Sequence, residues 1–146
     1  MTIGPANNRI LLVDDDDAVR TVIAEILGEA GYDVRQAAGP NEALCVPSAI
    51  AAPHFLITDV DLGAPMNGFD VAAEAHRRWP GVQVVLISGL PVGHTGQVLD
   101  PRDRYLQKPF AGARLLQAIE ERVDTAVPGQ FVPTAHVAHE QSLTFS

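Results

Sequence analysis

The chain has 146 residues, of which 47% are hydrophobic and 19% charged, so it is large enough for one packed domain. A formal net charge of −8 excludes the broad basic surface that binding to nucleic-acid phosphates requires. The first residues do not resemble a signal peptide, no apolar run reaches the roughly 18 residues of a membrane-spanning helix, and Cys45 is the only cysteine. We therefore expect a cytoplasmic domain that binds neither nucleic acid nor membranes, with Cys45 as a small buried residue.

Short apolar runs alternate with helical patterns along the chain. The first half predicts a strand at 9–13, a helix from Val19 that closes at Ala30–Gly31, a strand at 32–37, and a helix at 40–52 interrupted by Pro47. The second half predicts a strand at 54–58, a loop at 61–68, a helix at 69–79, a strand at 82–87, a short helix near Thr95–Leu99, a strand at 105–107 and a helix at 111–123.

This alternation of strands and helices indicates the fold class. Strands joined by right-handed helical crossovers form a parallel sheet with helices on both faces. We expect an α/β protein with a three-layer αβα sandwich around five parallel strands. In such sheets ligands bind at the carboxyl ends of the strands, so the residues at those ends are the candidates for function.

Polar residues follow four of the five predicted strands. They are Asp14 and Asp15 after the first, Asp59 after the third, Ser88 after the fourth and Lys108 after the fifth. Asp16 and Asp17 are expected to be the N-cap and first turn of the next helix, where the helix dipole favours acids.

The residue types at these strand ends indicate phosphoryl chemistry. Carboxylates packed together repel one another, and a hard cation such as Mg²⁺, which prefers oxygen ligands, relieves that repulsion. A lysine and a hydroxyl group beside the ion suit the oxygens of a phosphoryl group. An aspartate between the metal and the lysine can act as the nucleophile that accepts it.

Four motifs in this order resemble the receiver domain of two-component response regulators. They are Ile10-Leu-Leu-Val-Asp-Asp15, Leu56-Ile-Thr-Asp59, Leu86-Ile-Ser-Gly89 and Tyr105-Leu-Gln-Lys-Pro-Phe110. The resemblance implies a flavodoxin-like sheet with strand order 2-1-3-4-5. It also implies an N-terminal extension at 1–8, a stand-alone receiver domain at 9–124, and a flexible tail at 125–146 that is too short for an output domain.

The resemblance also implies roles for individual residues. Asp14, Asp15, Asp59 and the backbone carbonyl of Asp61 would bind Mg²⁺ or Mn²⁺. Asp59 would accept a phosphoryl group from a sensor histidine kinase or a histidine phosphotransfer protein, with Lys108 and Ser88 contacting the phosphoryl oxygens. Lys108–Pro109 would be a cis peptide.

The family's switch aromatic maps to Tyr105. The face around Thr95–Leu99, 105–107 and 111–123 would then change its affinity for a downstream protein, and receivers often form homodimers through the same region. The chain would be a signalling domain that catalyses its own phosphorylation and dephosphorylation, rather than an enzyme in the usual sense.

Other functions remain open at this point. The domain could be a receiver-like binding module that works without phosphorylation, or a receiver that drains phosphate from a kinase instead of driving an output. Asp59-Val60-Asp61 also superficially resembles the motif of haloacid-dehalogenase-type phosphatases. In that family, however, the metal-binding acids follow the lysine, whereas the cluster at 14–17 precedes it, and this chain has no room for a cap.

Overall fold

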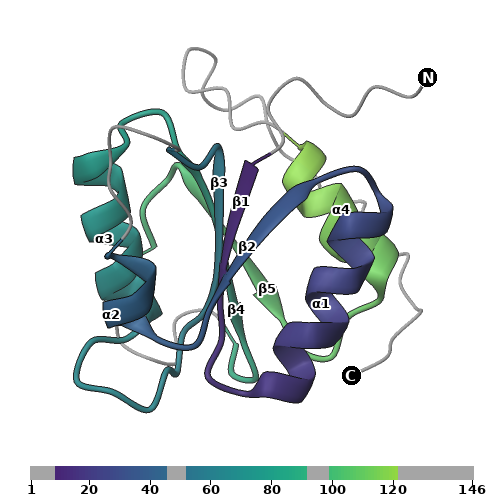
Figure 1. Cartoon of the computed structure of the whole chain (residues 1–146), viewed down its shortest axis with the longest axis horizontal. Coiled ribbons are helices and arrows are strands. Elements are labelled where there is room, and N and C mark those ends of the chain that lie inside the picture. The colour runs from purple at the N-terminus through teal and green to yellow at the C-terminus, as the bar shows by residue number, and fades with distance from the viewer. Residues whose placement is uncertain (1–8, 46–51, 92–98, 122–146) are drawn as a thin grey trace.

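The computed structural model describes residues 9–45, 52–91 and 99–121 and shows the expected three-layer sandwich (Figure 1). The parallel sheet has the order β2-β1-β3-β4-β5, and its strands are β1 (Arg9–Val13), β2 (Asp33–Ala37), β3 (Phe55–Asp59), β4 (Gln83–Ser88) and β5 (Asp103–Gln107). One face is covered by α1 (Asp17–Glu29) and α4 (Gly112–Glu120), and the other by α2 (Pro40–Ala43) and α3 (Gly68–Arg78). None of the described helices is long and apolar enough to span a membrane.

The central strands contribute side chains to two separate cores. In β1, Leu11 and Val13 pack on the side of α2 and α3, whereas Ile10 and Leu12 pack on the side of α1 and α4. Because helices cover both faces, a central strand is buried on both sides and reads as a continuous apolar run. The same burial explains why the apolar runs of β1, β3 and β4 allowed these strands to be predicted from the sequence.

Local capping determines where two helices begin. Asp16 is the N-cap of α1, as predicted, and its Oδ1 accepts hydrogen bonds from the backbone N–H groups of Ala18 and Val19 at 3.0 and 3.1 Å. Asn67 and Asp70 form a reciprocal capping box at the start of α3. Both helices therefore start next to strand ends, α1 after β1 and α3 after the loop that leaves β3.

The prediction of a helix at 40–52 is confirmed at 40–43 and wrong for the other described residues of this range. The helix α2 ends at Ala43, and Ala52 is not helical, while 46–51 lies outside the described residues. A proline at position 47 has no N–H to donate to the carbonyl group of residue 43, so a regular helix cannot continue through it. Cys45, expected to be buried, is exposed in the turn that follows α2.

Several predicted boundaries near the C-terminal half also differ from the structure. Strand β5 begins at Asp103, two residues before the predicted 105–107 run. In the predicted Thr95–Leu99 helix, 95–98 lies outside the described residues and Leu99 is not helical. The last helix ends at Glu120, where Glu121 is the C-cap, and Val123 lies outside the described residues.

Gly68 allows α3 to pack directly against the end of β3. A Cβ atom added at this glycine would lie 2.3 Å from the carbonyl oxygen of Asp59 and 2.8 Å from Cα of Val60. Both neighbours are backbone atoms that cannot rotate away. The N–H of Gly68 also donates to the carbonyl oxygen of Val60 at 2.8 Å, so the first turn of α3 is anchored beside Asp59.

Replacing Gly68 with alanine should therefore lower the free energy of unfolding by about 2 kcal/mol or more, since the backbone around Asp59 must shift to make room. Urea denaturation measures this change. Gly28→Ala is a matched control, because a Cβ atom at that exposed position in α1 meets nothing within 4 Å. It should stabilise the protein by about 0.5–1 kcal/mol. Equal unfolding midpoints for the wild type and Gly68→Ala would contradict this account of the packing.

Candidate functional site

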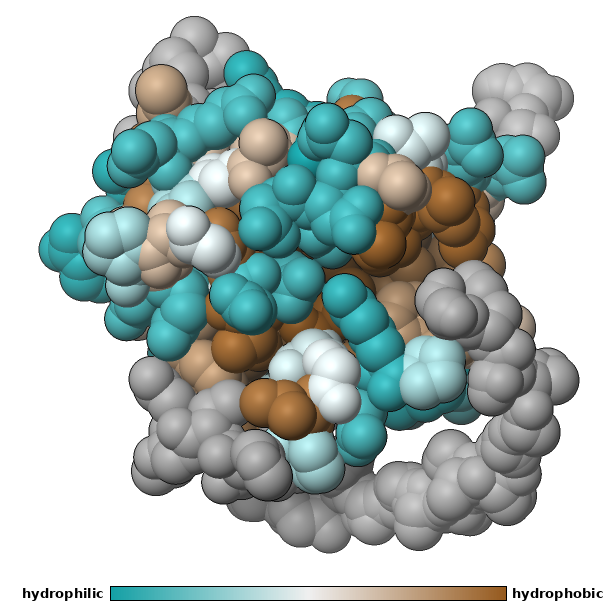
Figure 2. Space-filling view, turned by 90° about the horizontal axis from the view of Figure 1, so that it is seen from below, coloured by the Kyte–Doolittle hydropathy of each residue, from teal (hydrophilic) through white to brown (hydrophobic). Residues whose placement is uncertain are grey.

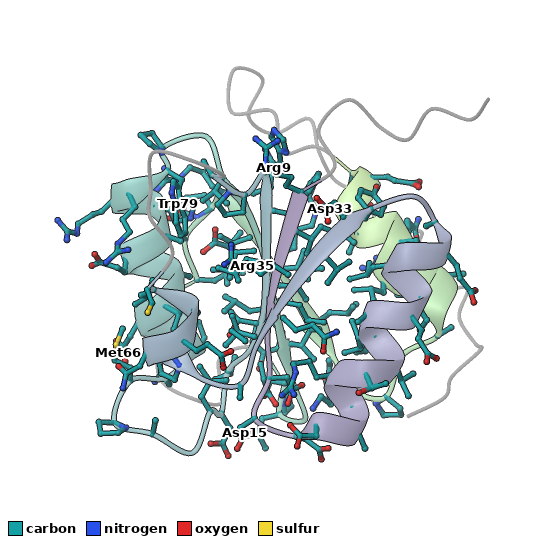
Figure 3. The ribbon with its side chains drawn as sticks, viewed as in Figure 1. Arg9, Asp15, Asp33, Arg35, Met66 and Trp79 are labelled. Atoms are coloured by element: carbon teal, nitrogen blue, oxygen red, sulfur yellow. The ribbon has the colours of Figure 1, made fainter. Side chains whose placement is uncertain are left out.

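Three carboxylates lie together at the carboxyl edge of the sheet. Strand register brings the ends of β1 and β3 side by side, because Val13 pairs with Thr58, and Asp14 and Asp59 follow these residues. One carboxylate oxygen from each of Asp14, Asp15 and Asp59 lies within 4.8 Å of the other two. Figure 3 shows Asp15 at this edge and Arg9 at the opposite one. Figure 2 looks onto this side of the molecule, where hydrophilic residues gather across the middle.

Burial makes this cluster electrostatically unfavourable in the absence of a cation. Asp14 is only 1% exposed, and its burial, with the neighbouring charges of Asp59 and Asp15, raises its pKa from 3.8 to about 6. A hydrogen bond of 2.9 Å from the backbone N–H of Asp16 to Asp14 Oδ1 partly opposes this rise in pKa. Burial also raises the pKa of Asp59, although Lys108 lowers it.

Lys108 supplies a positive charge from the end of β5. Its Nζ donates a hydrogen bond to Asp59 Oδ2 at 3.4 Å, and its backbone N–H donates to the carbonyl oxygen of Ser88 at 2.8 Å. The Lys108–Pro109 peptide is cis, as the resemblance implied. The lysine is therefore tied to β4 through its backbone and to Asp59 through its side chain.

Ser88 and Tyr105 are connected through the backbone of Leu90. The Ser88 hydroxyl oxygen, which is buried at the end of β4, accepts a hydrogen bond from the N–H of Leu90 at 3.0 Å. The hydroxyl group of Tyr105 donates to the carbonyl oxygen of Leu90 at 2.6 Å. Sequence reasoning selected Ser88 and Tyr105 but did not identify this backbone connection, because such a contact depends on the loop path and not on the side chain at position 90.

The loop after β3 also contacts the cluster. The backbone N–H of Asp61 donates to Asp59 Oδ1 at 3.1 Å, and the carboxylate of Asp61 accepts a hydrogen bond from Gly63 N–H at 3.2 Å. Gly63 has a φ of 62°, and a Cβ atom at this position would lie 3.0 Å from Asp15 Oδ2. Glycine at 63 therefore permits both the left-handed turn and the close approach to Asp15.

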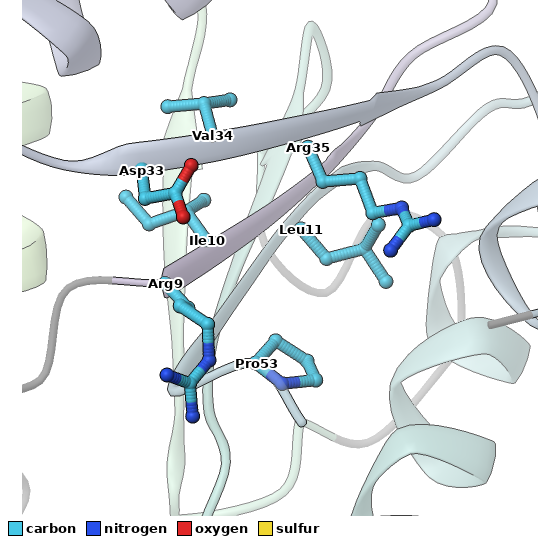
Figure 4. Close-up of a pocket in the computed structure, with 7 residues that line it drawn as sticks. All are labelled: Arg9, Ile10, Leu11, Asp33, Val34, Arg35 and Pro53. Atoms are coloured by element: carbon cyan, nitrogen blue, oxygen red, sulfur yellow. The ribbon is translucent and has the colours of Figure 1, made fainter. Parts of the chain in front are cut away.

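A separate cavity lies away from this site. It has a volume of about 250 Å³ and is lined by Arg9, Ile10, Leu11, Asp33, Val34, Arg35 and Pro53 (Figure 4). Arg9 and Asp33 begin β1 and β2 and pair with each other, so the cavity lies toward the amino ends of these strands. It includes none of the predicted site residues.

The arrangement at the carboxyl edge suits a hard divalent cation and an anion beside it. Only carboxylate oxygens contribute to the cluster of Asp14, Asp15 and Asp59, which is the donor chemistry that Mg²⁺ prefers. Burial and the neighbouring carboxylates raise the pKa of Asp14, and a bound cation would favour the charged form of this carboxylate. Beside Asp59, the Lys108 ammonium group can neutralise the charge of an incoming oxyanion.

Comparisons with known proteins agree with this fold. The family model for the response regulator receiver domain matches residues 10–120. The nitrogen assimilation regulatory protein NtrX of Azorhizobium caulinodans is 32% identical over 119 residues, covering 80% of this chain and 26% of that protein. This chain thus spans about a quarter of the length of that relative.

Solved structures match over most of the chain. A CheY-like response regulator receiver domain protein from Methanospirillum hungatei has a TM-score of 0.71 and 29% identity, with 82% of this chain and 96% of that chain covered. The response regulator TrrA from Thermotoga maritima, solved in complex with Mg²⁺-BeF, has a TM-score of 0.67 and 25% identity, with coverage of 77% and 96%. The family match, the strand order and the convergence of the four motifs at one edge all agree, and the chain belongs to the response regulator receiver domain family of two-component signalling.

Proposed function

We propose that Asp59 is the phosphoacceptor of a Mg²⁺-dependent switch. The observation that carries this proposal is the position of Asp59. Its carboxylate belongs to the cluster with Asp14 and Asp15, and its Oδ2 also accepts a hydrogen bond from the Lys108 Nζ at 3.4 Å. Among the described residues, no other carboxylate both belongs to this cluster and accepts a hydrogen bond from a lysine. The 9% exposure of Asp59 keeps it accessible to a donor at the edge of the sheet.

The transfer needs a nucleophile, a donor and charge neutralisation. An oxygen of Asp59 attacks the phosphorus of a phosphohistidine, the P–N bond breaks as the new P–O bond forms, and the histidine nitrogen leaves with its electron pair. The donor would be a sensor histidine kinase or a histidine phosphotransfer protein. Lys108 binds a phosphoryl oxygen, and Asp14, Asp15, Asp59 and the carbonyl group of Asp61 would hold the cation. When bound, Mg²⁺ or Mn²⁺ neutralises charge on the phosphoryl oxygens.

The domain also resets itself in this proposal. Water attacks the phosphorus of the acyl phosphate, the bond from phosphorus to the Asp59 oxygen breaks, and inorganic phosphate leaves. The chain is thus a signalling domain that carries out its own phosphorylation and dephosphorylation. The response regulator TrrA, which has a similar fold, was solved in complex with Mg²⁺-BeF, and this supports the proposal that the fold accommodates Mg²⁺.

The response to phosphorylation would pass through Ser88 and Tyr105. A phosphoryl group on Asp59 offers the Ser88 hydroxyl a new acceptor, and movement of Ser88 toward it breaks the 3.0 Å hydrogen bond from Leu90 N–H. Because the carbonyl group of Leu90 holds the Tyr105 hydroxyl, the preferred position of Tyr105 changes with the loop. This population shift would alter the face formed by β5 and α4, which binds a downstream protein or a second copy of the chain.

Incubation with acetyl phosphate tests the proposed acceptor. Intact-mass analysis should show a Mg²⁺-dependent gain of one phosphoryl group, and Asp59→Asn should abolish it because an amide is not nucleophilic enough to replace a carboxylate. Asp61→Asn is the matched control, since the proposed role of Asp61 uses its backbone, and it should retain labelling. Labelling of Asp59→Asn at the wild-type level would refute the assignment. Absence of both labelling and Mg²⁺ binding in the wild type would instead favour a phosphorylation-independent binding module.

The raised pKa of Asp14 predicts a specific pH dependence of stability without metal. Between pH 4 and 6 the folded state keeps a proton on Asp14 that the unfolded state has lost, so the free energy of unfolding falls as the pH rises. Asp14→Asn removes this penalty while preserving an acceptor for the Asp16 N–H. In EDTA the variant should be more stable than the wild type by on the order of 3 kcal/mol above pH 6, and this difference should vanish near pH 4.

Urea unfolding of both proteins across this pH range provides the measurement. Added Mg²⁺ at neutral pH should stabilise the wild type more than Asp14→Asn, because ligand binding to the folded state adds stability only where the site is intact. A difference between the two proteins that is independent of pH would show that Asp14 is not the titrating group.

A further inference from the structure

The side chain of Arg20 joins three parts of the fold directly behind the acidic cluster. Its guanidinium group donates hydrogen bonds of 2.6 Å to the carbonyl oxygen of Asp14, 2.6 Å to Asp17 Oδ1 and 3.2 Å to Gln36 Oε1. These acceptors belong to the end of β1, the first residue of α1 and β2. The Arg20 side chain is 15% exposed, so it lies largely within the structure despite its charge.

Of these contacts, the one to Asp14 bears on the site. The peptide unit that joins Asp14 to Asp15 is planar, so a hydrogen bond to its carbonyl oxygen restricts the orientation of the whole unit. That orientation sets the direction in which Asp15 leaves the strand. The N–H of Asp14 is held independently by the carbonyl oxygen of Ala37 at 3.1 Å, so the backbone of Asp14 is held from both sides.

The ion pair with Asp17 contributes much less. The Asp17 side chain is 84% exposed, and an exposed ion pair of this kind typically adds about 0–1 kcal/mol to stability. The hydrogen bond to the Asp14 carbonyl group is shielded from water and charge-assisted, which makes it the stronger restraint. Variants of Arg20 and Asp17 can therefore separate the two contacts.

We infer that Arg20 is a positioning residue for the cation site. Its guanidinium group holds the Asp14–Asp15 peptide so that both carboxylates face Asp59. This inference rests on the proposed Mg²⁺ site. Arg20 touches neither the cation nor the phosphoryl group in this role. It holds the backbone that carries two proposed metal ligands. Loss of a group that orients metal ligands in this way typically weakens metal binding by about 10- to 100-fold.

Charge and position predict opposite effects for Arg20→Met. Removing a positive charge near the site would by itself strengthen the binding of a cation. Releasing the Asp14–Asp15 peptide would weaken it. Weaker Mg²⁺ binding in this variant therefore indicates that the Asp14–Asp15 peptide has lost its position, because the loss of charge alone would strengthen binding. A lysine at position 20 keeps the charge but lacks the planar fork that reaches several acceptors at once, so Arg20→Lys should also weaken binding.

Calorimetric titration with Mg²⁺ alone tests the inference on the full chain. We expect the Kd for Mg²⁺ to rise about tenfold in Arg20→Met and by a smaller factor in Arg20→Lys. Asp17→Asn, the matched control, should remain within about twofold of the wild type because it removes only the exposed ion pair. Urea unfolding in EDTA accompanies each titration, so a loss of stability is measured separately from a loss of affinity.

Two outcomes would overturn different claims. If Arg20→Met and Arg20→Lys lose stability but bind Mg²⁺ as the wild type does, Arg20 is only a structural residue. If the wild type itself shows neither Mg²⁺ binding nor labelling by acetyl phosphate, the proposed function is wrong. The inference on Arg20, which rests on it, is then wrong as well. If Arg20→Met is unfolded in buffer without urea, Arg20→Lys provides the test. A Kd for Mg²⁺ equal to that of the wild type would then overturn the positioning role of Arg20.

Discussion

The electrostatic repulsion among Asp14, Asp15 and Asp59 is the constraint on which the rest of this structure depends. Two of these carboxylates are almost fully buried, and burial raises the pKa of both. Such a cluster persists only where surrounding groups compensate for it. Backbone N–H groups of Asp16 and Asp61 donate to the two buried carboxylates, and the Lys108 ammonium group also donates to Asp59. Part of the repulsion remains, and this remainder makes the edge receptive to a cation.

Parallel strand pairing brings the charged groups to one level of the sheet. Asp59 pairs with Ile87, and Ser88 with Gln107, so the ends of β3, β4 and β5 are reached almost together. The strands carry apolar side chains into two cores, whereas the proposed functional residues are the last residue of a strand (Asp59 and Ser88) or follow it (Asp14, Asp15 and Lys108). A shift in register would bury the wrong side chains and also separate the carboxylates from the lysine.

The site is connected to the surface by a short path through one residue. Leu90 receives the Tyr105 hydroxyl at its carbonyl oxygen and donates its N–H to Ser88. In the proposed switch, a change of hydrogen-bond partner at Ser88 would affect Tyr105 through Leu90, without a rearrangement of the sheet. Two hydrogen bonds in one loop can have alternative arrangements of similar energy, and a ligand that favours one of them shifts the population.

The sequence by itself determined the strands, their order of occurrence, the cap at Asp16 and the polar residues at the strand ends. These features were predictable because they depend on local patterns: a buried strand is apolar along its length, and an N-cap needs a short acceptor side chain. The resemblance of four motifs then predicted roles for these residues. All of the predicted side chains that surround Asp59 (Asp14, Asp15 and Lys108) do lie beside it.

Only the tertiary structure decided features that depend on distant partners. Asp103 joins β5, although it interrupts the apolar pattern, because it pairs with Val84 and its buried carboxylate lies 2.7 Å from His76 Nε2 of α3. Asp14 is buried while its neighbour Asp15 is exposed, although both follow β1 and both carboxylates belong to the same cluster. The contact of Arg20 with the Asp14 carbonyl group joins residues whose distance depends on how α1 folds back along β1 and β2. No local pattern records such a distance, because it is the packing of the helix on the sheet that creates it.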